Sequence, residues 1–218
     1  RYEVGRQLFL QMQDDPKCTA KMETMIGVLP SYTRLGMAAL LPHSTLSMKD
    51  DYTVLVDERN CDNLVERQTI LQMYQSDALC FQFDDIKSGN KPEMREIFTG
   101  RKLIYVYHNQ IDARGDKANT EDEVFMACQE AVNEIVEFIR RISSNGNTHH
   151  FIVTSDHGFL YKRNKITESE KISGVSGKKA FINRRFIVSD SPVRGDGIDC
   201  LSLGKILGNE DTKVVSFP

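Results

Sequence analysis

The segment 151–158, with the sequence FIVTSDHG, constrains the fold of this chain more than any other segment. An apolar run ends there in two adjacent side chains that can bind metal, Asp156 and His157, and in a glycine. In an open α/β sheet, ligands bind beyond the carboxyl ends of the parallel strands. We therefore predict that 151–154 is a buried parallel strand and that Asp156 and His157 lie at the edge of a sheet. The same residues are also compatible with an ordinary loop, in which Asp156 caps the next element.

The composition is that of a globular protein. The chain has 218 residues, of which 40% are hydrophobic and 27% are charged, and its formal net charge of −3 argues against a generally basic nucleic-acid-binding protein. Five cysteines without a C-x-x-C pair indicate neither a disulfide framework nor a cysteine zinc site, and they fit a cytoplasmic location. Neither a run of 18 apolar residues nor a signal peptide is visible, so no membrane association is expected. Because the sequence starts with Arg1 inside an expected helix, we interpret 1–218 as a single domain excised from a longer protein.

The order of the hydrophobic patterns predicts an α/β fold with a mainly parallel sheet. The clearest helix is expected at 120–142, where a capping box precedes apolar residues at helical spacing. It lies between two strand-like runs, 102–107 and 151–154, so we expect a right-handed βαβ unit. Further helices are expected at 2–12, 33–41 and 63–74, and further strands at 25–29, 52–56, 78–83, 186–188 and 213–217.

Polar motifs that can bind metal follow three of the expected elements. They are P-S-Y-T at 30–33, which places a hydroxyl at a helix start, D-A-R-G-D at 112–116 and S-D-H-G at 155–158. Such a set is typical of a two-metal hydrolase, in which cations about 3.5–4 Å apart activate an oxygen nucleophile and neutralise a transferring phosphoryl group. Thr33 is the candidate nucleophile, because a metal can activate its hydroxyl and a helix N-terminus favours negative charge. The alternative roles are a plain helix cap for Thr33 and turn positions for Asp112 and Asp116.

The motif order P-x-x-T, D-x-x-G-D, S-D-H-G resembles that of the alkaline phosphatase superfamily. More closely, the stretches LPSYTRLGMAALLPH, YVYHNQIDARGDK and FIVTSDHGFLYKR resemble the PglZ proteins of bacterial BREX phage-defence systems, in their type A, phosphatase-like branch. The resemblance covers essentially the whole chain. It implies an alkaline phosphatase-like, three-layer αβα sandwich, a metal site and a role in defence against phage.

The resemblance also implies a role for each motif residue. Thr33 matches the nucleophile, which also ligates one metal, and Asp156 with His157 matches the other protein ligands of that metal. Asp112 matches a ligand of the second metal, and Asp116 stands where related phosphodiesterases have a histidine. This oxygen-rich second site favours Mg²⁺ or Mn²⁺ over Zn²⁺. Two further family ligands, an aspartate and a histidine, have no counterpart here, so we expect residues 1–218 alone to bind metal weakly and to be close to inactive.

Two kinds of function are compatible with these residues. The first is a metal-dependent phosphoester hydrolase of a BREX defence protein, acting as a phosphatase, phosphodiesterase or nuclease with Zn²⁺, Mn²⁺ or Mg²⁺ as cofactor. The second is a non-catalytic module that binds proteins or DNA within the defence complex, which Asp116 in place of histidine favours. Other BREX proteins are the expected partners, and DNA is a candidate partner. Arg34, Lys162 and Arg163 form a candidate phosphate or nucleic-acid patch, with a solvated charged face as the alternative.

Overall fold

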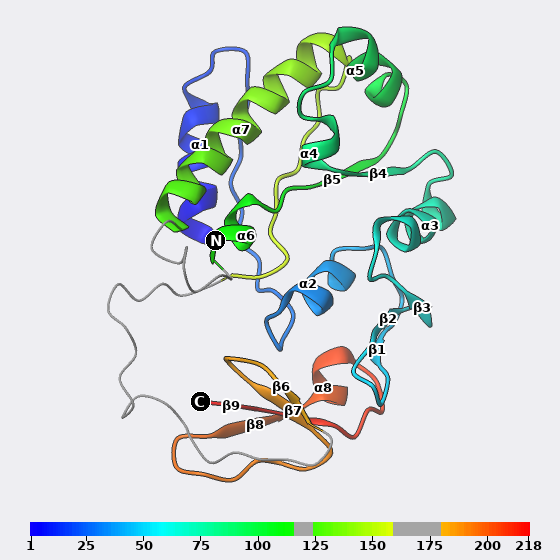
Figure 1. Cartoon of the computed structure of the whole chain (residues 1–218), viewed down its shortest axis with the longest axis vertical. Helices are drawn as coiled ribbons and strands as arrows, with labels where there is room; N and C mark the ends of the chain where they lie inside the picture. Colours follow the sequence, from blue (N-terminus) through cyan, green and yellow to red (C-terminus); the bar gives the residue numbers. More distant parts are fainter. Residues whose placement is uncertain (116–123, 159–179) are drawn as a thin grey trace. The chain divides into compact units, whose positions relative to one another are not determined.

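The computed structural model describes residues 1–115, 124–158 and 180–218, which fall into two compact units (Figure 1). The first unit comprises Arg1–Ile26 and Leu71–Gly158, and the second comprises Gly27–Ile70 and Phe159–Pro218. Both units combine helices with strands, so the predicted α/β class is confirmed.

The first unit is built on the long helix α7 (Val124–Asn145), which the apolar periodicity predicted. Helix α1 (Tyr2–Gln13), also predicted, packs against the middle of α7, where Leu8 and Met12 form a buried cluster with Val132 and Val136. At the exposed edge of this contact Arg140 forms an ion pair with Asp15, with an Nε–Oδ2 distance of 2.9 Å. These contacts fix α1 along α7.

A second buried cluster lies where α7 meets α4 (Phe83–Ile86) and α5 (Lys91–Phe98). Phe138 of α7 is at its centre, because its ring centroid lies 5.0 Å from that of Phe83 and 6.1 Å from that of Phe98. The hydrophobic pattern did not predict α5. Its start is nevertheless marked in the sequence by a capping box, in which Asn90 and Glu93 each accept a hydrogen bond from the other's backbone N–H.

The strands of the first unit are β4 (Leu79–Gln82) and β5 (Ile104–Tyr107), which pair in parallel with Leu79 opposite Ile104. The predicted strand at 151–154 is wrong. None of the described backbone hydrogen bonds joins this segment to a neighbour, and Ile152 is 94% exposed. An extended apolar segment becomes a strand only where another strand satisfies its backbone groups, so the expected βαβ unit is not formed by the described residues. The predicted strand at 25–29 is irregular for the same reason.

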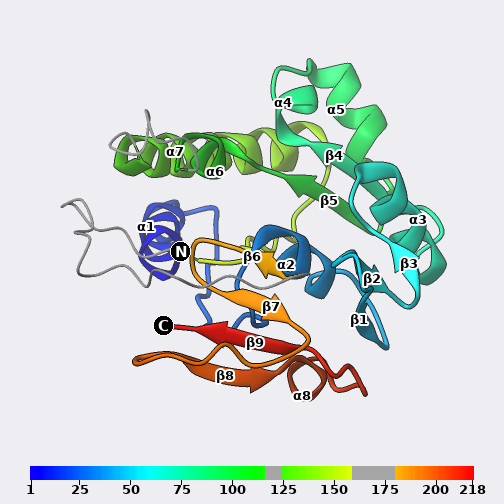
Figure 2. The same ribbon diagram turned by 60° about the horizontal axis from the view of Figure 1, so that its bottom comes forward.

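The second unit contains two antiparallel sheets, which Figure 2 shows from below. The first sheet has the order β1 (Leu46–Met48), β2 (Val54–Val56), β3 (Arg59–Asn60), and the second has the order β6 (Phe181–Ile182), β7 (Ile187–Ser189), β9 (Val214–Phe217), β8 (Asp199–Ser202). The predicted mainly parallel sheet is therefore not confirmed by the described strands. Short turns join β1 to β2, β2 to β3 and β6 to β7, and such turns can join only antiparallel neighbours, whereas β9 pairs with β7 and β8 over longer connections. Asp57 and Glu58, which turn the chain between β2 and β3, both have positive φ, as a two-residue hairpin requires.

Four further helices belong to the described chain. They are α2 (Thr33–Ala39), α3 (Leu64–Tyr74), α6 (Gln110–Gly115) and α8 (Leu203–Leu207). Helix α2 begins at the predicted residue and packs against β2, burying Leu35 and Ala38 completely. All five cysteines are free. Among the described helices, none has the length and apolarity that a membrane span needs.

Gly146 follows α7 at a point where a side chain has no room. A Cβ placed there would lie 2.8 Å from the Cβ of Phe98 and 3.1 Å from the carbonyl oxygen of Ile142. We expect Gly146→Ala to lower the free energy of unfolding by about 1–3 kcal/mol, which is the usual cost of overpacking. Urea unfolding followed by circular dichroism measures this change.

Gly5→Ala is the matched control for Gly146→Ala. Gly5 lies inside α1, and among the described residues a Cβ placed there would meet the Met22 side chain alone, at 3.9 Å. Because alanine favours a helix over glycine by about 0.5–1 kcal/mol, Gly5→Ala should stabilise the protein. A Gly146→Ala protein with the wild-type urea midpoint would show that the contact between α5 and α7 accommodates an extra methyl group.

Candidate metal centre

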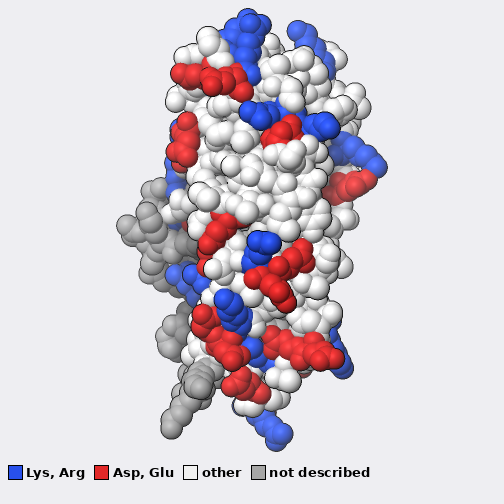
Figure 3. Space-filling model, turned by 90° about the vertical axis from the view of Figure 1, so that its right-hand side faces the viewer, with Lys and Arg blue, Asp and Glu red and all other residues white. Residues whose placement is uncertain are grey.

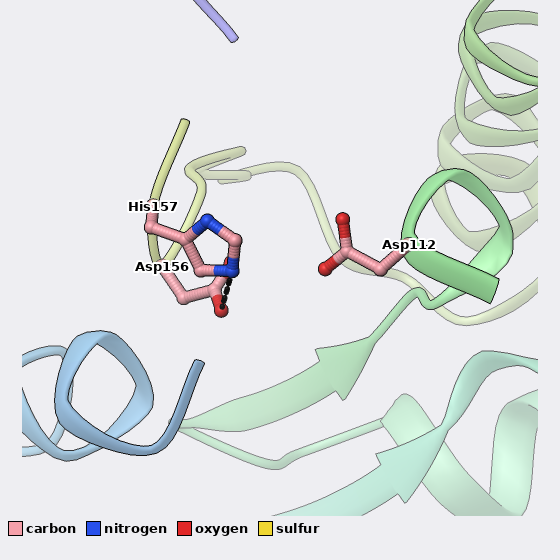
Figure 4. A group of neighbouring side chains, drawn as sticks. All are labelled: Asp112, Asp156 and His157. Carbon is pink, nitrogen blue, oxygen red and sulfur yellow. Dashed lines mark ion pairs between the residues drawn. The ribbon is translucent and has the colours of Figure 1, made fainter. Parts of the chain in front are cut away.

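Asp112, Asp156 and His157 come together in the first unit (Figure 4). One ligand atom from each of these three side chains can be chosen so that all three atoms lie within 4.8 Å of one another. In Figure 4 the carboxylate of Asp112 points toward the side chains of Asp156 and His157. The order of the sequence motifs thus placed three of the candidate ligands in one group, and their role as metal ligands stays a prediction.

Asp112 reaches the group because α6 follows β5 directly. The strand ends at Tyr107, and the N–H of Ala113 then donates to the carbonyl of Asn109 at 2.9 Å, which closes the first turn of α6. Arg114 of the same helix pairs with Glu130 of α7, with an Nη2–Oε2 distance of 2.6 Å. Helix α6 is therefore held between the strand exit and α7, and Asp112 is presented from a short, supported element.

The turn at 155–158 sets the orientation of the His157 ring. Its Nδ1 lies 3.0 Å from the carbonyl oxygen of Gly158, which can only accept a hydrogen bond, so Nδ1 carries the proton of the neutral ring. The other nitrogen, Nε2, lies 3.5 Å from Oδ2 of Asp156, and in the neutral ring it offers a lone pair. A backbone carbonyl on one imidazole nitrogen is the usual arrangement for a histidine that binds metal through the other. The Ser155 hydroxyl donates to the His157 carbonyl and tightens the turn.

Asp156 is a buried carboxylate with an oxygen that lacks a hydrogen-bond donor among the described residues. Its side chain is 8% exposed, and the oxygen without a described donor is Oδ2. Burial raises the pKa of Asp156, and the nearby Asp112 raises it further, while His157 acts in the opposite direction. A buried polar oxygen without a donor costs free energy, which a bound cation would offset. Two carboxylates and an imidazole form a donor set that fits Zn²⁺ and Mn²⁺ and is acceptable to Mg²⁺.

Arg1 is a residue of this group that the sequence did not reveal. Its guanidinium forms an ion pair with Oδ1 of Asp112, and its Nε donates to the His157 carbonyl at 3.3 Å. It neutralises part of the negative charge that the two aspartates bring together. No local pattern could have identified Arg1, because 111 positions separate it from Asp112 in the sequence.

Thr33 lies in the second unit, where it is the first residue of α2 and is exposed. The cap of this helix is Tyr32, which has extended φ and ψ of −154° and 161°, so the alternative role of Thr33 as a plain cap is wrong. Arg34 is also exposed, and its Nε lies 3.7 Å from Oδ1 of Asp62. Asp116 lies outside the described residues, and its predicted role as a metal ligand stays a prediction.

The predicted basic patch of Arg34, Lys162 and Arg163 stays a prediction. Lys162 and Arg163 lie outside the described residues, and Arg34 is paired with an acidic side chain. On the face drawn in Figure 3, the described basic and acidic side chains lie among one another and do not separate into patches of one sign. This mixture agrees with the small net charge of −3.

Comparison with known proteins gives consistent matches over the chain. A family model described as the BREX system PglZ alkaline phosphatase-like domain matches residues 1–218. The alkaline phosphatase-like protein PglZ of Bacillus cereus (strain H3081.97) is 35% identical over 223 aligned residues, which cover 100% of this chain and 26% of that protein. The alkaline phosphatase-like protein BrxZ of Escherichia coli O9:H4 (strain HS) is 36% identical over 173 residues, which cover 78% of this chain and 20% of that protein.

The chain thus spans about a quarter of the length of the first relative and a fifth of the second. No solved structure matches it at a significant level. The family model, by contrast, extends from the first residue to the last, and it covers both compact units. On this ground, the chain belongs to the family of BREX system PglZ alkaline phosphatase-like domains.

Proposed function

We propose that this domain, within its full-length protein, is a metal-dependent phosphoester hydrolase of a BREX phage-defence system. The observation that carries the proposal is the group of Asp112, Asp156 and His157, in which a buried oxygen of Asp156 has no hydrogen-bond donor among the described residues. Membership of an alkaline phosphatase-like family supports phosphoester chemistry at this group. In this proposal Thr33 is the nucleophile and Asp116 is an additional ligand.

The residues of the group have separate tasks in the proposed reaction. His157 offers Nε2 as a ligand, since its Nδ1 donates to a backbone carbonyl, and the two aspartates offer anionic oxygens. A bound cation would supply positive charge for the transferring phosphoryl group and, where it also contacts the nucleophile, would favour the deprotonated form of the attacking hydroxyl. In this proposal the Oγ1 proton of Thr33 passes to water and Oγ1 attacks phosphorus, while the leaving alkoxide takes up a proton from water. A second water then hydrolyses the threonyl phosphate, which restores the threonine hydroxyl and releases phosphate. Arg1 limits the repulsion between the aspartates.

Three broader statements follow from the family and belong to the same proposal. We propose that the two compact units form one domain, because a single family model covers both. The expected partners are other proteins of the BREX system, and the expected location is the cytoplasm. DNA is a candidate substrate. Zn²⁺, Mn²⁺ and Mg²⁺ are the candidate cofactors, and the carboxylates favour the last two.

A hydrolysis assay on the full-length protein tests the proposal. The substrates are bis-p-nitrophenyl phosphate, p-nitrophenyl phosphate and supercoiled plasmid. Protein treated with a chelator should hydrolyse none of them. Adding Mn²⁺, Mg²⁺ or Zn²⁺ should restore activity on at least one of them. The substrate that is turned over identifies a diesterase, a monoesterase or a nuclease. Metal binding without turnover of any substrate would contradict the hydrolase and favour the second candidate, a non-catalytic binding module, to which the aspartate at position 116 already points.

A further inference from the structure

We propose that Tyr32 is a positioning residue for Thr33, because the rings of Phe181 and Phe186 hold its side chain and thereby fix the start of α2. We call these two rings the aromatic socket. All four residues belong to the second unit. The inference rests on the proposed function for the role of Thr33 as nucleophile, whereas the anchoring of α2 can be tested without it.

Helix α2 depends on contacts outside itself for its position. It has seven residues, and a helix this short is not stable alone in water. Its cap, Tyr32, makes no side-chain hydrogen bond to the helix, and the first backbone bond runs from the N–H of Gly36 to the Tyr32 carbonyl at 3.0 Å. The direction in which the chain enters the helix, and hence the place of the Thr33 hydroxyl, follows from where Tyr32 is held.

Tyr32 and the two rings of the aromatic socket form a cluster of three mutually contacting rings. The centroid of the Tyr32 ring lies 5.3 Å from that of Phe181 and 5.4 Å from that of Phe186, and the two phenylalanine rings lie 5.8 Å apart. Tilted rings at these separations attract one another beyond the effect of burial alone. Tyr32 is 6% exposed and Phe186 is 5% exposed, so the contact is almost free of water.

The socket is carried by hydrogen-bonded structure. Phe181 lies in β6 opposite Val188 of β7, and Val188 is completely buried. The turn between these strands is closed by the N–H of Asn183, which donates to the carbonyl of Phe186 at 2.9 Å. Strand β7 continues the sheet through its pairing with β9. The two rings therefore have little conformational freedom, and their contacts with Tyr32 hold the start of α2 in place.

The ring of Tyr32 holds the residue in place, and its hydroxyl does not. Among the described residues the buried hydroxyl oxygen has no hydrogen-bond partner, and burial raises the pKa of Tyr32 to about 12. Arg34, two residues after Tyr32, forms an exposed ion pair with Asp62, and such a pair contributes little to holding the chain. Because Leu35 and Ala38 still pack α2 against β2, removal of the Tyr32 ring should loosen the start of α2, and removal of the hydroxyl alone should not.

The test compares three substitutions in the full-length protein by hydrolysis kinetics and by hydrogen exchange of the peptide 33–39. Tyr32→Leu removes the anchoring ring, Tyr32→Phe removes only the hydroxyl, and Phe98→Leu removes a buried ring of the first unit as the control. We expect Tyr32→Leu to lower kcat by about 10- to 100-fold with little change in KM, as a displaced reacting group does, and to speed exchange of 33–39. Tyr32→Phe should match the wild type, and Phe98→Leu should leave exchange of 33–39 unchanged.

The outcomes separate this inference from the proposed function. Thr33 is not a nucleophile if Thr33→Ala keeps wild-type turnover, or if the wild type has no turnover. In either case the exchange of 33–39 alone decides whether Tyr32 anchors α2. If Thr33→Ala is inactive but Tyr32→Leu keeps wild-type kcat, the positioning role is overturned, whatever its exchange. Should Tyr32→Leu fail to fold, Phe186→Leu removes one side of the aromatic socket and carries the same expectations.

Discussion

Asp156→Ala in the full-length protein is expected to abolish metal binding at the candidate centre and to lower hydrolysis by at least about 100-fold. Losing an outer-shell partner of a ligand already costs about 10- to 100-fold in affinity or activity, and losing a ligand itself should cost more. The protein should still fold, because the substitution removes a buried carboxylate oxygen that has no hydrogen-bond donor among the described residues. The substitution should therefore remove activity and leave folding intact.

Calorimetric titration with Mn²⁺ and the hydrolysis assay check this expectation together. Asp14→Ala is the matched control, since Asp14 is an exposed aspartate of the same unit that does not belong to the group of Asp112, Asp156 and His157. It should bind metal and turn over substrate as the wild type does. Wild-type stoichiometry and turnover in the Asp156→Ala protein would show that Asp156 is not a ligand, and the non-catalytic module would then be the better proposal.

Phe138→Ala is expected to lower the free energy of unfolding by about 3–5 kcal/mol, the largest stability effect that we predict. Phe138 is 7% exposed and contacts the rings of both Phe83 and Phe98 in edge-to-face geometry. Truncation removes these aromatic contacts and leaves a cavity where α7 meets α4 and α5. The loss should shift the midpoint of urea unfolding without changing its slope.

The same helix provides the control for Phe138→Ala. Phe125 also lies in α7 but is 56% exposed, so Phe125→Ala makes the identical chemical change with little loss of burial. Its effect should stay within about 1 kcal/mol. A Phe138→Ala protein that is destabilised no more than the Phe125→Ala protein would mean that the neighbouring side chains collapse into the cavity.

The sequence determined those features that depend on neighbouring positions along the chain. The apolar stripe of α7 and the β-branched and aromatic run of β5 were found because helix and strand periodicities are local properties. The start of α2 at Thr33 was found from the preceding proline and polar residues. The sequence indicated that Asp112, Asp156 and His157 would lie near one another because each follows a strand-like run, although the run at 151–154 did not form a strand.

The tertiary structure alone decided those features that depend on a distant partner. The segment 151–154 is as apolar as a buried strand, yet it is not one, because a strand needs a neighbour for its backbone and no described strand pairs with it. Short turns made β1–β2, β2–β3 and β6–β7 antiparallel, whereas the place of β9 between β7 and β8 depends on pairing between segments that are farther apart in the sequence. Arg1 meets Asp112, and Tyr32 meets Phe181, across long stretches of sequence. Hydrophobic periodicity shows which side of an element is buried, and it carries no information about which residue covers that side.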